Sequence, residues 1–359
     1  MYEKSGHTAG VARIKCSELY SAQKRTEMSS NVIKRKTDGK IIRLSRNQLG
    51  IKSIAALALL VLLTWEGRAV LSSMQRSLRL CAGTIIPALF PYLAASELLV
   101  SSGAGERLAS RMSAPIRAVF CVSPCGAVVY VMGILCGFPV GASMAAAYAR
   151  LGKISREELT HLLCFCNVPS MAFVVNAVGV SLYGRSDLGW RLWGISLISA
   201  AIVGVMYRCI FYKELRDQGK TASEYLPRVA QCEGNPLSRA AMGMLSVVST
   251  VLFFGALLGA LGAALQHLPG VPLGGWPQGF AMLSAMLEMS SGVAAISALP
   301  GAMSPVWCAA ALGWGGLSVH YQLLSASGDM LLRRSTTRFF IARLSQALLC
   351  AVGIWLLEI

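Results

Sequence analysis

The chain has 359 residues, of which 55% are hydrophobic and only 14% are charged. An ordinary soluble domain carries about 25% charged residues, so this composition excludes a disordered chain and a typical cytosolic enzyme. Aromatic residues make up only 8% of the chain, so the hydrophobic excess is aliphatic. The composition predicts an all-α polytopic membrane protein, in which each crossing helix needs about 20 apolar residues.

The net charge is +16, and twelve of the 33 Lys and Arg residues lie within the first 52 positions. Most of the others lie between apolar runs, which is typical of orientation in a membrane and not of nucleic-acid binding. The 11 cysteines are scattered, and no CxxC pair occurs among them. We therefore expect neither a disulfide framework nor a metal site or other cofactor.

The N-terminal region reads as two parts. Residues 1–50 have no sustained apolar period, and we interpret them as a mostly disordered cytoplasmic tail that contacts anionic lipid. Residues 51–80 are interpreted as an anchor helix, Ile51–Trp65, followed by a connection. Met28 is an alternative start, which would leave residues 1–27 untranslated.

Eight further apolar runs follow in the chain. They are Cys81–Val100, Val119–Ala149, His161–Tyr183, Leu188–Tyr212, Ala241–Gln266, Phe280–Leu299, Met303–Ala326 and Phe339–Leu357.

The positive-inside rule decides how these runs cross. With the tail inside, the basic connections near Lys153 and Lys220 stay inside only if Val119–Ala149 is a re-entrant hairpin. The uncharged residues 300–301 stay outside if Phe280–Leu299 is a second hairpin. We therefore expect about seven crossing helices plus two re-entrant helical hairpins in the cell membrane, with a cytoplasmic N-terminus. The alternative is about eight or nine plain spans.

The arrangement with hairpins contains an internal repeat. Residues 81–212 and 241–359 both consist of a span, a hairpin and two further spans, and the loop 213–240 separates them. One repeat starts outside and the other inside, so together they form an inverted repeat of the kind found in many secondary transporters.

Each repeat has two interruptions by helix-breaking or polar residues, at 137–141 and 167–170 in the first and at 288–292 and 313–318 in the second. Freed backbone groups at membrane depth need protein, water or a ligand as partners, so the interruptions favour a central polar site. Kinked helices packed through small residues are the alternative interpretation. The candidate solute-binding residues are Gly137, Pro139, Gly141, Asn167, Ser170, Glu288, Ser290, Ser291, Gly315, Gly316, Ser318 and His320.

Three of these side chains carry distinctive chemistry. Glu288 lies inside an apolar run, where a carboxylate costs about 2.5–3.5 kcal/mol unless it is paired or wetted. It is either a ligand for solute, cation or proton, or a neutralised structural group. Asn167 offers donors and acceptors that suit a solute or a neighbouring helix. His320 either binds solute or forms a hydrogen bond within the helix bundle.

No motif of a known enzyme class appears. The sequence lacks a Walker motif, HExxH and GxSxG, and no paired-acid or Ser/His constellation stands out, so we do not expect an enzyme.

Several motifs resemble those of the sporulation integral membrane proteins of the YlbJ type, in the same order along the chain. They are Pro87–Tyr92, Ser96–Leu99, Met132–Ser143, Leu151–Leu159, Leu287–Gly292, Gly315–His320 and Phe340–Leu344. That family is assigned the nucleoside-recognition, or Gate, domain. The resemblance implies two Gate-like repeats with broken helices and a role in spore envelope formation.

Three hypotheses for function follow. In the first, the protein binds or transports a small polar solute, for which the resemblance implies a nucleoside-like molecule. In the second, it is a non-transporting morphogenetic protein of the spore envelope or cortex. In the third, it conducts metal ions. The expected partners are the lipid bilayer and the solute, with a homo-oligomer left open and nucleic acid excluded.

Overall fold

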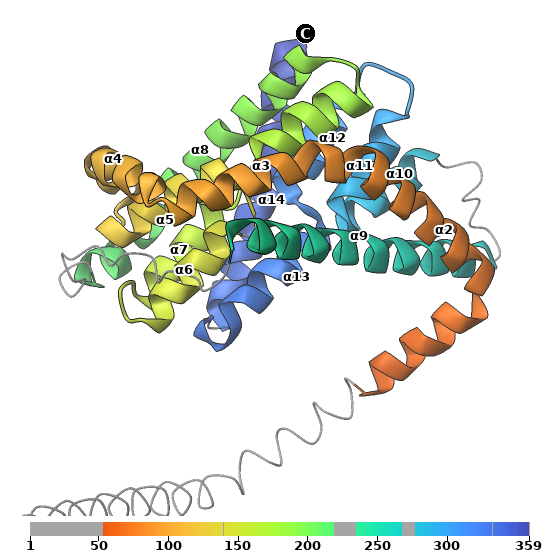
Figure 1. Cartoon of the computed structure of the whole chain (residues 1–359), viewed down its shortest axis with the longest axis horizontal. Helices are drawn as coiled ribbons and strands as arrows, with labels where there is room; N and C mark the ends of the chain where they lie inside the picture. The colour runs from red at the N-terminus through yellow and green to blue at the C-terminus, as the bar shows by residue number, and fades with distance from the viewer. Residues whose placement is uncertain (1–52, 139, 219–234, 268–276, 332, 359) are drawn as a thin grey trace, which may run out of the picture. The chain divides into compact units, whose positions relative to one another are not determined.

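The computed structural model describes residues 53–138, 140–218, 235–267, 277–331 and 333–358 (Figure 1). The chain forms two compact units, Met1–Trp65 and Glu66–Ile359. In the first unit, Ser53–Trp65 form a short apolar helix, within the run expected for the anchor. The basic tail, residues 1–50, lies outside the described residues.

The secondary-structure elements in the described part of the second unit are all helices. Four of its helices are long and apolar enough to cross a membrane, and a bent pair, 110–120 and 124–136, adds a fifth if it counts as one span. Such helices indicate a multi-pass membrane protein, as the composition predicts. The four are Gly67–Leu99, Ser186–Phe211, Pro236–Gln266 and Ser335–Glu358.

Each of the four remaining apolar runs is divided into two shorter helices. This is why counting by length gives four or five spans among the described residues instead of about seven. The divisions coincide with the interruptions in the sequence. The pairs are α5 (Pro124–Cys136) with α6 (Val140–Arg150), α7 (Arg156–Phe165) with η2 (Ala172–Leu182), α10 (Pro277–Leu287) with α11 (Met289–Ser297), and α12 (Ser304–Trp314) with α13 (Gly316–Ser327).

The connection expected before residue 81 is instead helical. α2 (Gly67–Leu80) continues through a π-helical turn, Cys81–Ile85, into α3 (Ile86–Ser101). Both α2 and α3 pack along α9, Pro236–Gln266 (Figure 1). Ser73 in α2 donates a hydrogen bond to the carbonyl of Gly255 in α9, over 2.8 Å. This tertiary contact explains why a polar stretch with three arginines stays helical.

The basic connection after α3 is also a helix, α4 (Ala104–Phe120). It meets α5 at an angle of 101°. Arg208 of α8 (Ser186–Gln218) donates hydrogen bonds to the carbonyls of Ala118 and Val119 in the last turn of α4. A cation at this end of a helix complements its dipole.

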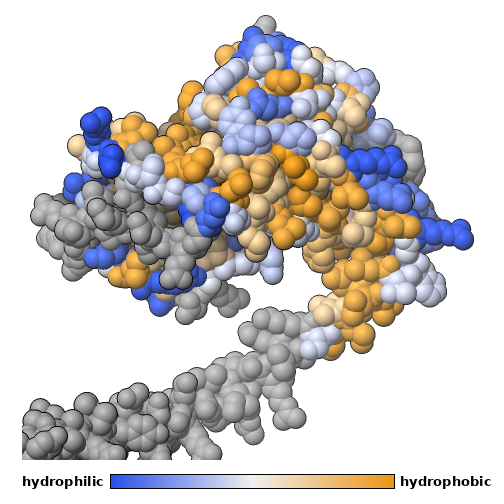
Figure 2. Space-filling model, viewed as in Figure 1, coloured by the Kyte–Doolittle hydropathy of each residue, from blue (hydrophilic) through white to orange (hydrophobic). Residues whose placement is uncertain are grey.

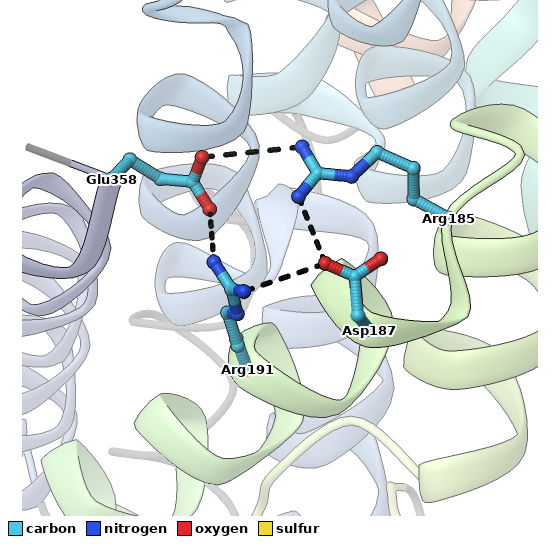
Figure 3. Close-up of polar contacts among 4 residues, drawn as sticks. All are labelled: Arg185, Asp187, Arg191 and Glu358. Atoms are coloured by element: carbon cyan, nitrogen blue, oxygen red, sulfur yellow. Dashed lines mark hydrogen bonds and ion pairs between the residues drawn. The ribbon is translucent and has the colours of Figure 1, made fainter.

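Two long helices, α8 and α14 (Arg333–Glu358), pack against each other. At one end of this pair, four exposed or half-buried charged residues form a ring of ion pairs, drawn in Figure 3. Exposed pairs of this kind contribute little individually. The ring nevertheless links the turn before α8 to the last turn of α14. Its members are Arg185, Asp187, Arg191 and Glu358.

The surface of the second unit suits contact with lipid. Figure 2 shows apolar residues over much of its visible face and hydrophilic residues toward the edges. Large side chains such as Leu245, Phe253 and Leu348 are exposed. An exposed apolar surface of this extent is unusual for a soluble monomer.

Candidate functional site

The two interruptions of the first repeat lie against each other. Gly137 has a φ of +71°, which favours glycine, and a Cβ there would lie 2.7 Å from the backbone nitrogen of Ser170. The adjacent N–H of Phe138 donates to the carbonyl of Val168, over 3.2 Å. The break between α5 and α6 therefore supplies a donor to the break between α7 and η2.

The second repeat has an equivalent contact. Gly316 has a φ of +75°, and a Cβ on it would lie 2.8 Å from the backbone nitrogen of Met289. The break between α12 and α13 therefore packs directly on the break between α10 and α11. In both repeats, a positive-φ glycine allows two interrupted helices to approach this closely.

All four breaks contribute to one pocket of about 50 Å³. This volume accommodates a few water molecules. Its polar side chains come from both repeats, α9 of the second repeat included, and apolar side chains complete the wall. The lining residues are Leu89, Phe138, Ser170, Phe173, Val247, Thr250, Val251, Glu288, Met289, Ser290, Ser318, Val319 and Gln322.

Glu288 is 2% exposed and caps the N-terminus of α11. One carboxylate oxygen accepts the N–H of Ser290 at 2.9 Å, and the other accepts the N–H of Ser291 at 2.6 Å. Two donors that the helix itself leaves free, together with the helix dipole, stabilise the charge. This arrangement explains how a carboxylate is accommodated inside an apolar run without an arginine partner.

Asn167 is not among the residues that line the pocket. Its side-chain amide donates to the carbonyl of Leu163 at 3.1 Å, while its side-chain oxygen has no partner among the described residues. Gly141 packs close to that oxygen and to the backbone of Gly133. These small residues let α5 and α6 approach the broken α7, which fits the packing interpretation of the glycines.

His320 also lies away from the pocket lining. Its Nε2 is 2.9 Å from the carbonyl oxygen of Trp314, which can only accept, so Nε2 carries the hydrogen. The ring lies edge-on to Trp314, Phe339 and Phe340. This fits the interpretation of His320 as a hydrogen-bonded histidine within the bundle.

The structure therefore divides the predicted site residues into three groups. Ser170, Glu288, Ser290 and Ser318 line the pocket. Gly137 and Gly316 lie where the breaks that form the pocket walls approach each other closely. The residues outside the lining and these contacts are Gly141, Asn167, Ser291, Gly315 and His320. Pro139 lies outside the described residues.

Sequence reasoning missed two polar lining residues and one buried cation. Thr250 and Gln322 join α9 to α13 through a hydrogen bond of 2.8 Å, and neither interrupts its helix. Arg343 of α14 is fully buried and donates to carbonyls at two of the breaks. Its signal in the sequence is an arginine within the apolar run 339–357, whose partners only the fold reveals.

A larger open cleft of about 480 Å³ lies beside the ring of ion pairs. It is lined by Tyr183, Arg185 and the segment 297–306, and by no predicted site residue. Among the side chains the structure describes, no group of three His, Cys, Asp or Glu residues could hold a metal ion. Four of the predicted site residues thus line the pocket at the breaks, and none lines this cleft.

The fold and pocket define a helical protein with membrane-length helices and a polar pocket at interrupted helices. No family model, curated protein or solved structure matches the chain.

Proposed function

We propose that this protein is an integral membrane protein that binds and moves a small polar solute through the pocket at its helix breaks. The observation that supports the proposal is that all four breaks line one pocket containing a carboxylate, three serines and a threonine. Helix breaks at membrane depth are the usual binding elements of secondary transporters.

The lining indicates the class of solute. Glu288, Ser170, Ser290, Ser318 and Gln322 offer hydrogen-bond acceptors and donors, and no Lys or Arg is among the lining residues. A neutral or cationic solute with hydroxyl or amino groups fits this chemistry. The resemblance to Gate-domain proteins favours a nucleoside-like solute. A pocket of about 50 Å³ must widen to hold a whole nucleoside, so binding of one would require its walls to move apart.

The proposed architecture retains about seven crossings and two re-entrant hairpins in an inverted repeat. Equivalent elements of the two halves have equivalent neighbours, which supports the repeat. α5 packs on α6 as α10 packs on α11, and α8 contacts α7 as α14 contacts α12. α8 and α14, the last helices of the two repeats, also contact each other.

The proposed biological setting is the membrane of a spore-forming bacterium, with the basic tail on the cytoplasmic side. Only the sequence resemblance supports this setting. Deleting the gene in a spore-forming host should lower the yield of heat-resistant spores. Normal spore yield would contradict this part of the proposal.

The binding proposal is tested with purified full-length protein. Thermal unfolding is followed in the presence of a panel of nucleosides, sugars and amino acids, and at least one class should raise the midpoint. Ser290→Ala should weaken that shift, because Ser290 lines the pocket. Ser291→Ala on the same turn is the matched control and should leave the shift unchanged. No shift with any class, or equal effects of the two variants, would contradict the proposal.

A further inference from the structure

Arg343 is the largest fully buried side chain described, and its hydrogen-bond acceptors are all uncharged. Nε donates to the carbonyl of Trp314 at 3.2 Å. Nη1 donates to the carbonyl of Asn167 at 2.8 Å and to the side-chain oxygen of Gln346 at 2.7 Å. Among the side chains that the structure describes, none with a carboxylate forms an ion pair with it.

The two backbone acceptors come from opposite halves of the repeat, and both lie where a half-helix ends. Trp314 is the last residue of α12, and Asn167 follows the C-cap residue of α7. The C-terminal end of a helix carries a partial charge of about −0.5, so two such ends together offset about one positive charge. This accounts for a guanidinium buried without an acid.

Half-helix ends and unwound carbonyls of this kind are where transporters generally bind a coupling cation. Here the chain supplies a cation of its own at such ends. We propose that the guanidinium of Arg343 is the fixed cation of this junction, which joins the two halves in place of a bound monovalent metal ion. It follows that the solute binding proposed above requires no Na⁺. This consequence rests on that proposed function.

Gly315 supports the assignment. Its φ is +85°, and a Cβ on it would lie 2.9 Å from Nη2 of Arg343. Nη2 has no hydrogen-bond partner among the described residues. The absence of a side chain at position 315 therefore leaves room for a group as large as a guanidinium.

Chemical rescue tests the proposal. Arg343→Ala removes the cation and leaves a cavity of its shape, so the thermal midpoint of the purified full-length variant should fall. Low-millimolar guanidinium chloride should recover most of this loss, whereas the same concentration of choline chloride should not. Wild-type protein should respond to neither salt. A folded Arg343→Ala variant that guanidinium fails to stabilise would overturn the proposal.

Arg208→Ala is the matched control, because Arg208 also donates to two carbonyls at a helix end but belongs to a single repeat and is not buried. It should lose less stability and gain nothing from guanidinium. If Arg343→Ala does not accumulate, Arg343→Lys and Arg343→Gln decide, because lysine keeps the positive charge and glutamine removes it. A Gln variant as stable as the Lys variant would overturn the proposal.

A second measurement addresses the metal ion directly. The wild-type midpoint should be the same in NaCl, KCl and choline chloride at equal ionic strength, and Na⁺-specific stabilisation would overturn the proposal. None of these experiments uses a solute. A failure of the solute hypothesis therefore remains distinguishable from a failure of the fixed cation.

Discussion

Glu288 combines two roles that substitution can separate. Its carboxylate caps α11, and it also lines the pocket. Serine is a preferred N-cap residue, so Glu288→Ser keeps a cap while removing the charge. Glu288→Ala removes both the cap and the charge. The two variants therefore report on capping and on solute binding independently.

We expect Glu288→Ser to retain stability to within about 1 kcal/mol, whereas Glu288→Ala should lose about 1–2 kcal/mol. Both should lose the solute-induced shift in thermal midpoint, because the carboxylate is gone. Thermal unfolding with and without the solute measures both effects. Full binding by Glu288→Ser would assign Glu288 to capping alone.

Substitution of Gly316 tests the contact between the break after α12 and the break after α10. Alanine at its φ of +75° costs about 1–2 kcal/mol in any surroundings, and here the Cβ would also meet the backbone of Met289. Gly316→Ala should therefore lose about 3 kcal/mol or more.

Gly152 provides the control for this prediction, since its φ is +66° and nothing lies within 4 Å of a Cβ built there. Gly152→Ala should lose only the conformational part, about 1–2 kcal/mol. The midpoints of the two variants, measured under the same conditions, check the difference. Equal losses would show that the breaks do not depend on this approach.

The sequence predicts the structural roles of some residues but not of others. Glycines at 137 and 316 mark the breaks, because only glycine readily adopts their positive φ. The capping role of Glu288 is not predictable, since glutamate is not a preferred N-cap residue. Arg343 is missed because two of its partners are the backbone carbonyls of Trp314 and Asn167, which no side-chain pattern reveals.

At the scale of elements, α5 and α7 are fixed to each other at their N-termini. Each begins with a serine cap, Ser123 and Ser155. Glu158 of α7 accepts the backbone N–H of Ser123 at 2.6 Å and is itself buried. Burial raises the pKa of the Glu158 carboxyl, and the hydrogen bonds from Ser123 oppose this rise.

This raised pKa predicts a pH dependence. Because folded Glu158 binds its proton more tightly than unfolded Glu158, its contribution is most favourable below about pH 4.3, the ordinary glutamate pKa. It is lost as pH rises through the folded-state pKa. Glu158→Gln should remove this component, so the midpoint of the variant should change less with pH above about 4.3.

Thermal unfolding across a pH series checks this expectation, with Glu157→Gln as a control of equal charge change on the same turn. The Glu157 variant keeps Glu158 and should therefore retain the fall in midpoint above about pH 4.3. Identical profiles for wild-type and Glu158→Gln would contradict a desolvated carboxyl at this position.

The elements that the sequence predicts are those with a clear hydrophobic pattern. The long apolar helices and all four divided runs appear where hydropathy and breakers place them. Hydropathy does not predict α2 and α4. Each contains arginines, which indicate a connection between spans when the stretch is considered alone. α4 could have been found from Leu108, Met112 and Ile116, which recur every four residues on one face. α2 depends on its packing against α9, which is a tertiary effect.

At the scale of the molecule, the side of the membrane on which each connection lies depends on the divided runs. A run that is re-entrant returns to the side from which it entered the membrane, whereas a plain span does not. If Val119–Ala149 and Phe280–Leu299 are re-entrant, Lys153 is cytoplasmic and His267 is external. About nine plain spans would reverse both positions. The proposed inverted repeat corresponds to the first arrangement, since an inverted repeat requires the hairpins.

Cysteine labelling in intact cells distinguishes the two arrangements. On a background without native cysteines, Lys153→Cys should react with a membrane-impermeant maleimide only after the cells are opened, and His267→Cys should react before. Ala302→Cys is external in both arrangements and controls for access of the reagent. Labelling of Lys153→Cys in intact cells would remove the first hairpin. Because the two repeats would then no longer be inverted, the proposed inverted repeat would be wrong as well.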